Sequence, residues 1–277
     1  MTSIIQHTFI YPIKSLAGIA CDSLVLTDRG AKGDRRWMLV DNGGRFISQR
    51  EWPKLCLMRM LMADDGFEIV APNGESLLVP FAIESGTTRE VSIWSDIASA
   101  IESPLQINQF FSRALDMSCS LVYMPEDSHR YVDSTYAGDG QLTSFSDAFP
   151  LLLIGSSSLL ELNRRLKTVG QLEIGWDRFR PNIVVATDEP HVEDSWAEFR
   201  MGEAEAIGVK LCSRCVMTTV DQTSGMTGKE PLKTLAQYRS MKNKIMFGQN
   251  VIAQQGTIRV GDTVSVKRIA FPLNAEF

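Results

Sequence analysis

Alternating apolar and polar residues are the first regular feature of the amino-terminal part of the chain. The segments "IIQHTFI", "RRWMLVD", "RFIS", "GFEIVA" and "SLLVP" carry β-branched and aromatic residues, which fit the pleated surface of a β-strand. Asn42-Gly43-Gly44 and Asn73-Gly74 separate two pairs of these segments, and such residues accept the positive φ angles of tight hairpins. The pattern predicts an antiparallel, β-rich first region that folds as a small barrel.

The spacing of apolar residues changes near position 103. Ser103 followed by Pro104 suits an N-cap and a proline in the first helical turn. A helix is therefore predicted to begin here. The apolar residues that can line one face of this helix are Leu105, Phe110, Phe111 and Leu115.

Short strands dominate the remainder of the chain. "CSLVYM" predicts a strand, and "FPLLLIGSSSLLELNRRLK" predicts a buried strand, a serine-rich turn and an amphipathic helix. The polar stretch 125–140 is expected to be a loop or a domain seam, and a second helix is expected over 231–238. Further strands are predicted for "PNIVVA", "VKL", "CVMTTV", "TIRV" and "TVSVKRI". Because strands and helices do not alternate as βαβ units, the pattern favours an α+β, predominantly β class.

Length and charge narrow the class of protein. A chain of 277 residues can bury one large core or two ordinary ones, and we expect two closely packed halves. The formal charge of -5 gives no general attraction to nucleic acid or to anionic membranes, so an anion would need a local basic pocket. No signal peptide and no run of 18 apolar residues is visible, so we expect a cytoplasmic protein.

Five cysteines are present, which is an odd number. Cys21, Cys56 and Cys119 are widely scattered, so a secreted disulfide framework is not expected. Cys212 and Cys215 are instead three positions apart, in "CSRCVMTTVD". This pair is the most informative cysteine pattern in the sequence.

Several interpretations of Cys215 remain open from the residues alone. Isolated cysteines usually pack as small apolar groups. A redox pair with Cys212 would normally open a helix, whereas the following "VMTTV" predicts a strand. A zinc site would need two more ligands, but His7, His129 and His191 are isolated.

A single thiolate can also bind a soft transition metal whose other ligands come from a cofactor. Arg214, or another cation in the same cleft, would favour the thiolate over the thiol. This interpretation fits a metal that is delivered inside an anionic organic chelate.

Several basic residues and hydroxyl groups that could bind such a chelate lie near the ends of predicted strands. Arginine forks match phosphate and planar heterocycles, whereas lysine acts as a mobile point charge. Surface solubility explains any one of these residues equally well, and helix capping explains the serines of "GSSSL". A serine hydrolase is disfavoured because no G-x-S-x-G motif is present. The candidate anion-binding residues are Lys14 and Ser15 in "YPIKS", Arg35 and Arg36 in "GDRRW", and Arg178, Arg180 and Asn182 in "RFRPN".

Taken in order, these motifs resemble the MOSC family, in which a β-barrel amino-terminal domain precedes a molybdenum-cofactor sulfurase carboxy-terminal domain. The resemblance covers nearly the whole chain, which makes it more specific than any single motif. It implies two packed β-barrel-like domains, 1–120 and 121–277, with a few peripheral helices. The segments that carry it are "YPIKSLAG", "GDRRWMLVD", "FSDAFPLLLIGSSSLLELN", "RFRPNIVV", "CSRCVMTTVD", "EPLKTLAQYR", "FGQNVIA" and "IRVGDTVSV".

The resemblance also implies a site between the two domains. Cys215 would be the protein ligand to the metal of a molybdenum cofactor (Mo-molybdopterin). Asp221 would either donate a proton near the metal or simply form a turn. The positions implied to contact the cofactor are Lys14, Ser15, Arg35, Ser156, Ser158, Arg180 and Asn182.

The function implied is an oxidoreductase that reduces N-hydroxylated compounds. One branch of the family carries a plant-type ferredoxin module, but its C-x4-C-x2-C pattern is not found here, so electrons would come from a separate ferredoxin, flavin or haem protein. A monomer is expected. The main alternative is a carrier that delivers molybdopterin or sulfur without turnover, and a third hypothesis is a structural barrel with an ordinary CxxC pair.

Overall fold

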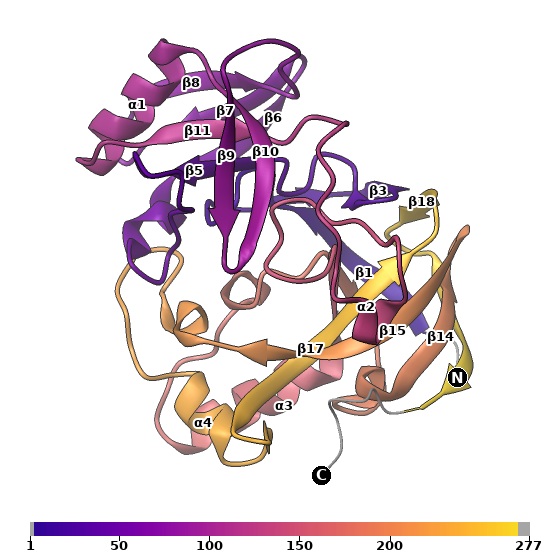
Figure 1. Ribbon diagram of the computed structural model, residues 1–277. Helices are drawn as coiled ribbons and strands as arrows, with labels where there is room; N and C mark the ends of the chain where they lie inside the picture. Colours follow the sequence, from indigo (N-terminus) through magenta and orange to yellow (C-terminus); the bar gives the residue numbers. More distant parts are fainter. Residues whose placement is uncertain (1–2, 271–277) are drawn as a thin grey trace.

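A computed structural model describes residues 3–270 of the chain. Strands hold 41% of the residues and helices 18%, which confirms the α+β, predominantly β class. The larger unit is a closed barrel, of which β1, β14, β15 and β17 are labelled in Figure 1. Pairing of β17 with β12 completes the ring. Neighbouring strands of the barrel are antiparallel except for β12 and β13, which are parallel. In order around the ring the strands are β12 (Leu151–Gly155), β13 (Ile183–Val185), β1 (Ser3–Ile10), β19 (Thr263–Ile269), β14 (Trp196–Met201), β15 (Ala204–Arg214) and β17 (Lys244–Ala253).

Smaller sheets make up most of the first half of the chain. Two short strands extend the barrel sheet: β2 (Ile19–Cys21) beside β1 and β16 (Ser240–Met241) beside β17. A four-stranded sheet has the order β5 (Trp37–Val40), β11 (Ser120–Tyr123), β10 (Asp96–Glu102) and β9 (Thr88–Ile93). A three-stranded sheet has the order β6 (Arg59–Ala63), β7 (Gly66–Val70) and β8 (Ser76–Pro80). Another three-stranded sheet has the order β18 (Gly256–Arg259), β3 (Ser23–Thr27) and β4 (Gly30–Ala31).

The two halves of the chain exchange strands. β1 comes from the first residues but lies in the barrel between β13 and β19, and β18 comes from the second half but pairs with β3. β11 spans the expected boundary between residues 120 and 121. That boundary stays a prediction, and the exchanged strands show that the halves fold against each other.

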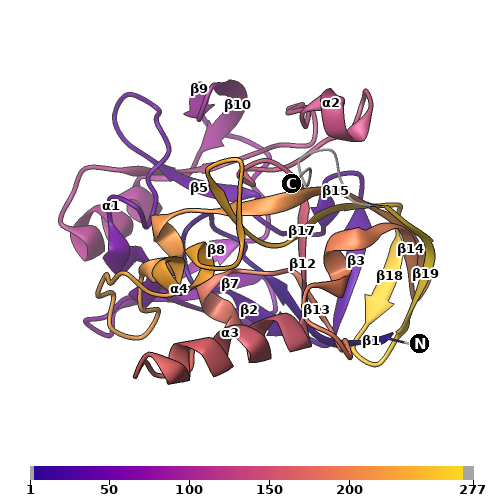
Figure 2. The same ribbon diagram turned by 90° about the horizontal axis from the view of Figure 1, so that it is seen from below.

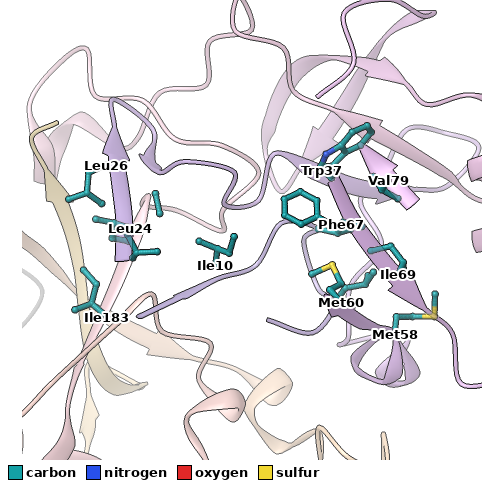
Figure 3. Close-up of a cluster of buried hydrophobic side chains, with 14 of the residues drawn as sticks. Ile10, Leu24, Leu26, Trp37, Met58, Met60, Phe67, Ile69, Val79 and Ile183 are labelled. Carbon is teal, nitrogen blue, oxygen red and sulfur yellow. The ribbon is translucent and has the colours of Figure 1, made fainter. Parts of the chain in front are cut away.

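One continuous hydrophobic core crosses between these halves. Ile183 on β13 and Leu24 on β3 belong to the same cluster as Trp37, Phe67 and Val79 on the smaller sheets (Figure 3). Trp37 and Phe67 are fully buried. Burying a side chain of this kind stabilises the fold by about 2 to 3 kcal/mol, so the shared core holds the two halves in a fixed relation.

Four α-helices lie outside the sheets in the described part of the chain. α3 packs leucines against the outer face of β12, and it lies along the outside of the barrel (Figure 2). No helix within residues 3–270 has both the length and the apolar character needed to cross a bilayer. The α-helices are α1 (Leu105–Leu115), α2 (Ser134–Ala137), α3 (Ser156–Thr168) and α4 (Leu232–Ala236), and the 3-10 helices are Pro53–Leu57, Trp176–Arg178, Val192–Ser195 and Val216–Thr219.

Three local predictions are wrong. Leu105 does not join the buried face of α1 because its side chain is 69% exposed, and Pro104 rather than Ser103 occupies the N-cap position. The Ser103 hydroxyl instead donates to the side-chain oxygen of Asn108. The segment "VMTTV" after Cys215 is a 3-10 helix, Val216–Thr219, rather than a strand. Its threonine hydroxyls hydrogen-bond to carbonyls three residues earlier, which stabilises the tight turn over the β propensity of the residues.

Candidate functional site

A cleft of about 380 Å³ lies where the two halves of the chain meet. Six cationic side chains line it, but only one carboxylate, that of Asp147, does so among the described residues. This concentration of positive charge contrasts with the net charge of -5 on the whole chain, and it provides the local basic pocket that an anion would require. The cationic residues are Lys14, Arg35, Arg50, Lys210, Arg180 and Arg214.

Three of the expected binding residues have left-handed backbone conformations at this cleft. The φ angles are 69° at Ser15, 48° at Arg35 and 57° at Arg180. Residues other than glycine rarely adopt such angles, and each costs on the order of 1 to 3 kcal/mol unless the surrounding structure imposes it. All three residues line the cleft. Strain gathered in this way is typical of a site where function sets the backbone.

Tyr11 is the platform for the two arginines. The guanidinium carbon of Arg35 lies 4.5 Å from the centre of the tyrosine ring, and that of Arg180 lies 4.2 Å from it. The tyrosine hydroxyl donates to the carbonyl of Pro181, and the main-chain amide of Tyr11 donates to Asp34. Ring stacking therefore holds two positive charges close together at the edge of the cleft.

One nitrogen of the Arg180 guanidinium is a hydrogen-bond donor without a partner among the described residues. Burial, together with the nearby charge of Arg35, lowers the pKa of Arg180 to about 10. One guanidinium nitrogen donates to the carbonyl of Leu16 at 2.5 Å, whereas Nη2 is buried and has no hydrogen-bond partner among the described residues. A buried arginine nitrogen without a partner is costly, so this donor would be stabilised by an acceptor bound in the cleft.

Asn182 connects Arg35 to two strands of the barrel, β1 and β12. Its Oδ1 atom accepts from Arg35 at 3.0 Å and from the main-chain amide of Leu152 at 3.2 Å, and its Nδ2 atom donates to the carbonyl of Phe9. The side chain is fully buried and lines the cleft. Asn182 thus positions Arg35 relative to β1 and β12.

Cys215 follows β15 directly and begins the 3-10 helix Val216–Thr219. The amide and hydroxyl of Thr218 both donate to the carbonyl of Cys215, which fixes the backbone beside the thiol. Arg50 donates from Nε to Cys215 Sγ at 3.2 Å. The same guanidinium lies 4.5 Å from the ring centre of Trp94 and donates to Asp147 at 2.8 Å. The Cys215 thiol therefore faces the Arg50 guanidinium, which Trp94 and Asp147 hold in place.

From the residues alone, either Arg214 or another cation in the cleft was expected beside the Cys215 thiol, and the structure places the second, Arg50, there. Arg214 donates to Cys212 Sγ at 2.8 Å and to the carbonyl of Phe179 at 2.6 Å, so the structure pairs it with the other cysteine. Arg214 and Cys215 line the same cleft, but the guanidinium that reaches Cys215 Sγ comes from Arg50. All five cysteines lie in the described range and are free thiols. Within that range no three His, Cys, Asp or Glu side chains gather as ligands for one metal ion.

Lys14 is held beneath the cleft by Asp147. Its ammonium group donates to the Asp147 carboxylate at 2.5 Å and to the carbonyl of Phe145 at 2.8 Å. Burial lowers the pKa of Lys14 to about 8, although the Asp147 charge acts in the opposite direction. Burial alone would raise the pKa of Asp147, but the charges of Lys14 and Arg50 hold it well below its usual range. The three groups form a charged unit that links Cys215 to Lys14.

Ser156 and Ser158 lie away from this cleft, at the start of α3. The hydroxyl of Ser156 accepts from the main-chain amide of Thr187. That of Ser158 donates to Glu193 at 2.6 Å and accepts from the main-chain amide of His191. The structure therefore uses both serines to join α3 to the loop before β14, and it does not bring them to the other candidate residues.

Asp221 forms a turn just beyond the 3-10 helix. Its Oδ1 atom accepts from the amides and hydroxyls of Thr223 and Ser224, and its Oδ2 atom accepts from Arg178 at 2.9 Å. These hydrogen bonds hold the pKa of Asp221 well below its usual range. Of the two expectations for this residue, the geometry favours the turn-forming acid, because a strongly stabilised carboxylate is a poor proton donor. The side chain does not line the cleft.

Several residues of the cleft were not singled out from the sequence, among them Arg50, Trp94 and Asp147. Arg50 reaches Cys215 across 165 positions of the chain, and Asp147 lies 133 positions from Lys14. No local pattern marks such pairs. The only available indication was the presence of Asp147 in the quoted segment "FSDAFPLLLIG".

Comparison with known proteins identifies the family. Residues 2–118 match the MOSC N-terminal beta barrel domain, and residues 141–265 match the MOSC domain. Mitochondrial amidoxime-reducing component 1 of Mus musculus is 31% identical, and the match covers 94% of this chain and 81% of that protein. This chain belongs to the MOSC family. Among its MOSC relatives, molybdenum cofactor sulfurase of Oryza sativa subsp. japonica is 34% identical over 88% of this chain. The MOSC chain spans only 32% of that sulfurase and 35% of the one from Solanum lycopersicum.

The cleft of this MOSC chain suits an organic anion that carries a metal. Arg180 Nη2 and Ser146 Oγ are both buried without a partner among residues 3–270, and both residues line the cleft. The thiol of Cys215 lines the same cleft, beside Arg50. A thiolate, hydrogen-bond donors and excess positive charge are the groups that a molybdenum-bearing pterin phosphate would require. The residues present therefore fit the cofactor that is linked to this family.

Proposed function

We propose that this protein binds a molybdenum cofactor in the cleft, with Cys215 as the metal ligand, and reduces N-hydroxylated compounds. The observation that carries the proposal is the position of Cys215 beside Arg50 in a cleft lined by six cationic side chains. Supporting it, relatives named amidoxime-reducing components match 94% of this chain. Expectations of a cytoplasmic location and a monomeric state rest on the sequence alone.

Each half of the cleft would hold a different part of the cofactor. Arg35 and Arg180, which stack on Tyr11, would bind the anionic pterin and phosphate portion through charge-assisted hydrogen bonds. Asn182 would assist by holding Arg35 in place. Cys215, beside Arg50, would hold the metal. The metal would then lie at the end of β15, because Cys215 follows that strand directly.

The proposed reaction converts an amidoxime to an amidine. One N–O bond breaks, two electrons and two protons are consumed, and the oxygen leaves as water. When bound, the molybdenum cofactor supplies this two-electron chemistry, and the electrons come from a separate ferredoxin, flavin or haem protein. Lys14 is one cleft group that could exchange a proton near neutral pH, because burial lowers its pKa to about 8.

Metal analysis tests the cofactor site. We expect molybdenum and pterin to co-purify with the chain from a host that makes the cofactor, and Cys215→Ser to lose the metal. Cys212→Ser is the matched control, because that thiol is held by Arg214 rather than Arg50, and it should retain molybdenum. Equal metal content in Cys215→Ser and the native chain would refute the assignment.

Turnover tests the reaction. The loaded protein should reduce benzamidoxime when a chemically reduced viologen supplies electrons, and Cys215→Ser should not. A second candidate function, delivery of cofactor to another enzyme, is favoured by the 34% identity to a molybdenum cofactor sulfurase. Transfer of molybdenum to an apo-enzyme without any reduction of benzamidoxime would support delivery instead.

A further inference from the structure

A second cavity, of about 210 Å³, adjoins the main cleft. Two of its walls, Arg50 and Trp94, are also walls of the main cleft. Arg50 joins the two spaces physically, since its Nε atom donates to Cys215 Sγ while its guanidinium stacks on the Trp94 ring. The complete lining is Arg45, Phe46, Ser48, Arg50, Glu51, Ser92 and Trp94.

Trp94 occupies an unfavourable position for its residue type. It is the first of two residues that connect β9 to β10, because Ile93 pairs directly with Asp96. Its φ angle is 57°, and glycine is the usual residue where a two-residue hairpin needs a positive φ. A bulky residue with this conformation is a true outlier, and such outliers cluster at ligand clamps.

The aromatic surface of Trp94 is open to solvent. The side chain is 53% exposed, although a large apolar group at a hairpin tip gains little by facing water. Phe46 packs edge-on against it, with ring centres 5.0 Å apart, and so fixes the orientation of the indole. The hairpin therefore presents a rigid aromatic wall immediately beside the guanidinium that contacts Cys215.

We propose that this cavity is the subsite for an aromatic ring of the substrate, whose N-hydroxylated group then projects past Arg50 toward Cys215. A cavity of about 150 Å³ is enough to hold benzene, so the available volume accepts one six-membered ring. Trp94 and Phe46 supply the faces and edges on which such a ring packs. The inference rests on the proposed reductase function and deepens it, because it selects aryl amidoximes over alkyl ones.

Two substrates that differ only in the ring provide the test. Benzamidoxime carries the phenyl group, whereas acetamidoxime carries a methyl group in its place. In Trp94→Leu, the ratio of kcat/KM for benzamidoxime to that for acetamidoxime should fall by about fivefold or more, because one aromatic contact is lost. Trp94→Tyr keeps a ring and should keep most of the preference. Phe81→Leu, which alters another exposed aromatic residue just after β8, is the matched control and should keep the native ratio.

A binding measurement separates this inference from the proposed function. Calorimetric titration of benzamidoxime into the molybdenum-loaded chain, with no electron donor present, should show the same weakening, by about fivefold, in Trp94→Leu. Unchanged binding in that variant, or the same loss in Phe81→Leu, would overturn the subsite. If binding depends on Trp94 but no N-hydroxylated compound is ever reduced, the subsite stands and the reductase function fails.

Discussion

The charged unit of Lys14, Asp147 and Arg50 yields a quantitative prediction for Asp147→Asn. Asparagine has nearly the shape of aspartate and keeps an oxygen acceptor, so the substitution removes mainly the negative charge. That charge lies 2.5 Å from the Lys14 ammonium and 2.8 Å from the Arg50 guanidinium. Without it, a buried ammonium and a neighbouring guanidinium repel each other with no carboxylate between them.

The size of the effect follows from the distances and the exposure. Two unit charges 4 Å apart attract by about 1 kcal/mol in water and by about 4 kcal/mol at an effective dielectric constant of 20. Because the Asp147 side chain is 44% exposed, the lower part of this range applies, and we expect a loss of about 1 to 2 kcal/mol. The same change should lower the pKa of Lys14 from about 8 to about 7.

The pKa of Lys14 determines how the effect of Asp147→Asn on stability should change with pH. Lys14 in the folded chain has a pKa below its ordinary value, so between about pH 8 and about pH 10 the unfolded chain binds more protons and stability rises with pH. In Asp147→Asn this rise should begin near pH 7. The gap in stability between native chain and variant should therefore be widest at neutral pH and should narrow as Lys14 loses its proton.

Urea unfolding followed by tryptophan fluorescence can measure this gap at about pH 7 and about pH 10. A double-mutant cycle with Lys14→Met isolates the interaction between the two side chains. A coupling free energy of about 1 kcal/mol or more at neutral pH is expected, with a much smaller value at high pH. A gap that stays constant with pH, or no coupling with Lys14→Met, would refute the reasoning.

Three further predictions concern other parts of the molecule. Burial raises the pKa of Glu193, so the folded chain keeps a proton that the unfolded chain releases, and stability should fall as the pH rises through that range. In urea unfolding between about pH 5 and about pH 8, Glu193→Gln should flatten this fall of the midpoint. Substitution of an exposed glutamate, Glu198→Gln, should leave the fall unchanged. Parallel pH profiles for the two variants would contradict the prediction. Tyr11→Leu should lower the free energy of unfolding by about 3 kcal/mol, because the buried ring supports two guanidinium groups; a loss below about 1 kcal/mol in urea unfolding would argue against that role. Hydrogen bonds from the hydroxyls of the residues after Asp221 hold its pKa well below its usual range. Asp221→Asn should therefore leave the shape of the pH profile of kcat unchanged but speed proteolysis of this loop. Loss of one limb of that profile would show a proton-transfer role instead.

The local elements were largely predictable because their determinants are local. Period-two apolar patterns placed β1 and the β7–β8 hairpin, whose connection contains Asn73-Gly74 as expected. The segment before and after Gly155 gave β12 and α3. Predictions failed where neighbouring side chains decided the outcome. The threonines after Cys215 have high β propensity, but their hydroxyls bond to carbonyls three residues back and form a 3-10 turn.

The candidate site was predictable only in part. The cysteine pair and the arginine-rich motifs could be recognised as chemistry-bearing residues, and the structure places Lys14, Arg35, Arg180 and Cys215 around one cleft. Ser156 and Ser158 carried an equally suggestive pattern but face the loop before β14. Residue type indicates what a side chain can do, but it does not indicate which way the side chain points.

By itself, the sequence determined the predominantly β class, the family and the chemical character of its conspicuous residues, because these depend on periodicity, composition and motif order. Only the tertiary structure decided which cation faces which thiol: Arg50 contacts Cys215, and Arg214 contacts Cys212. It also placed Asp147 between Lys14 and Arg50. Apart from the pair Arg214 and Cys212, these contacts join residues more than 90 positions apart, and barrel closure and the shared core bring them together. Short-range patterns carry no information about such pairs, so the electrostatics of the cleft arise from the fold.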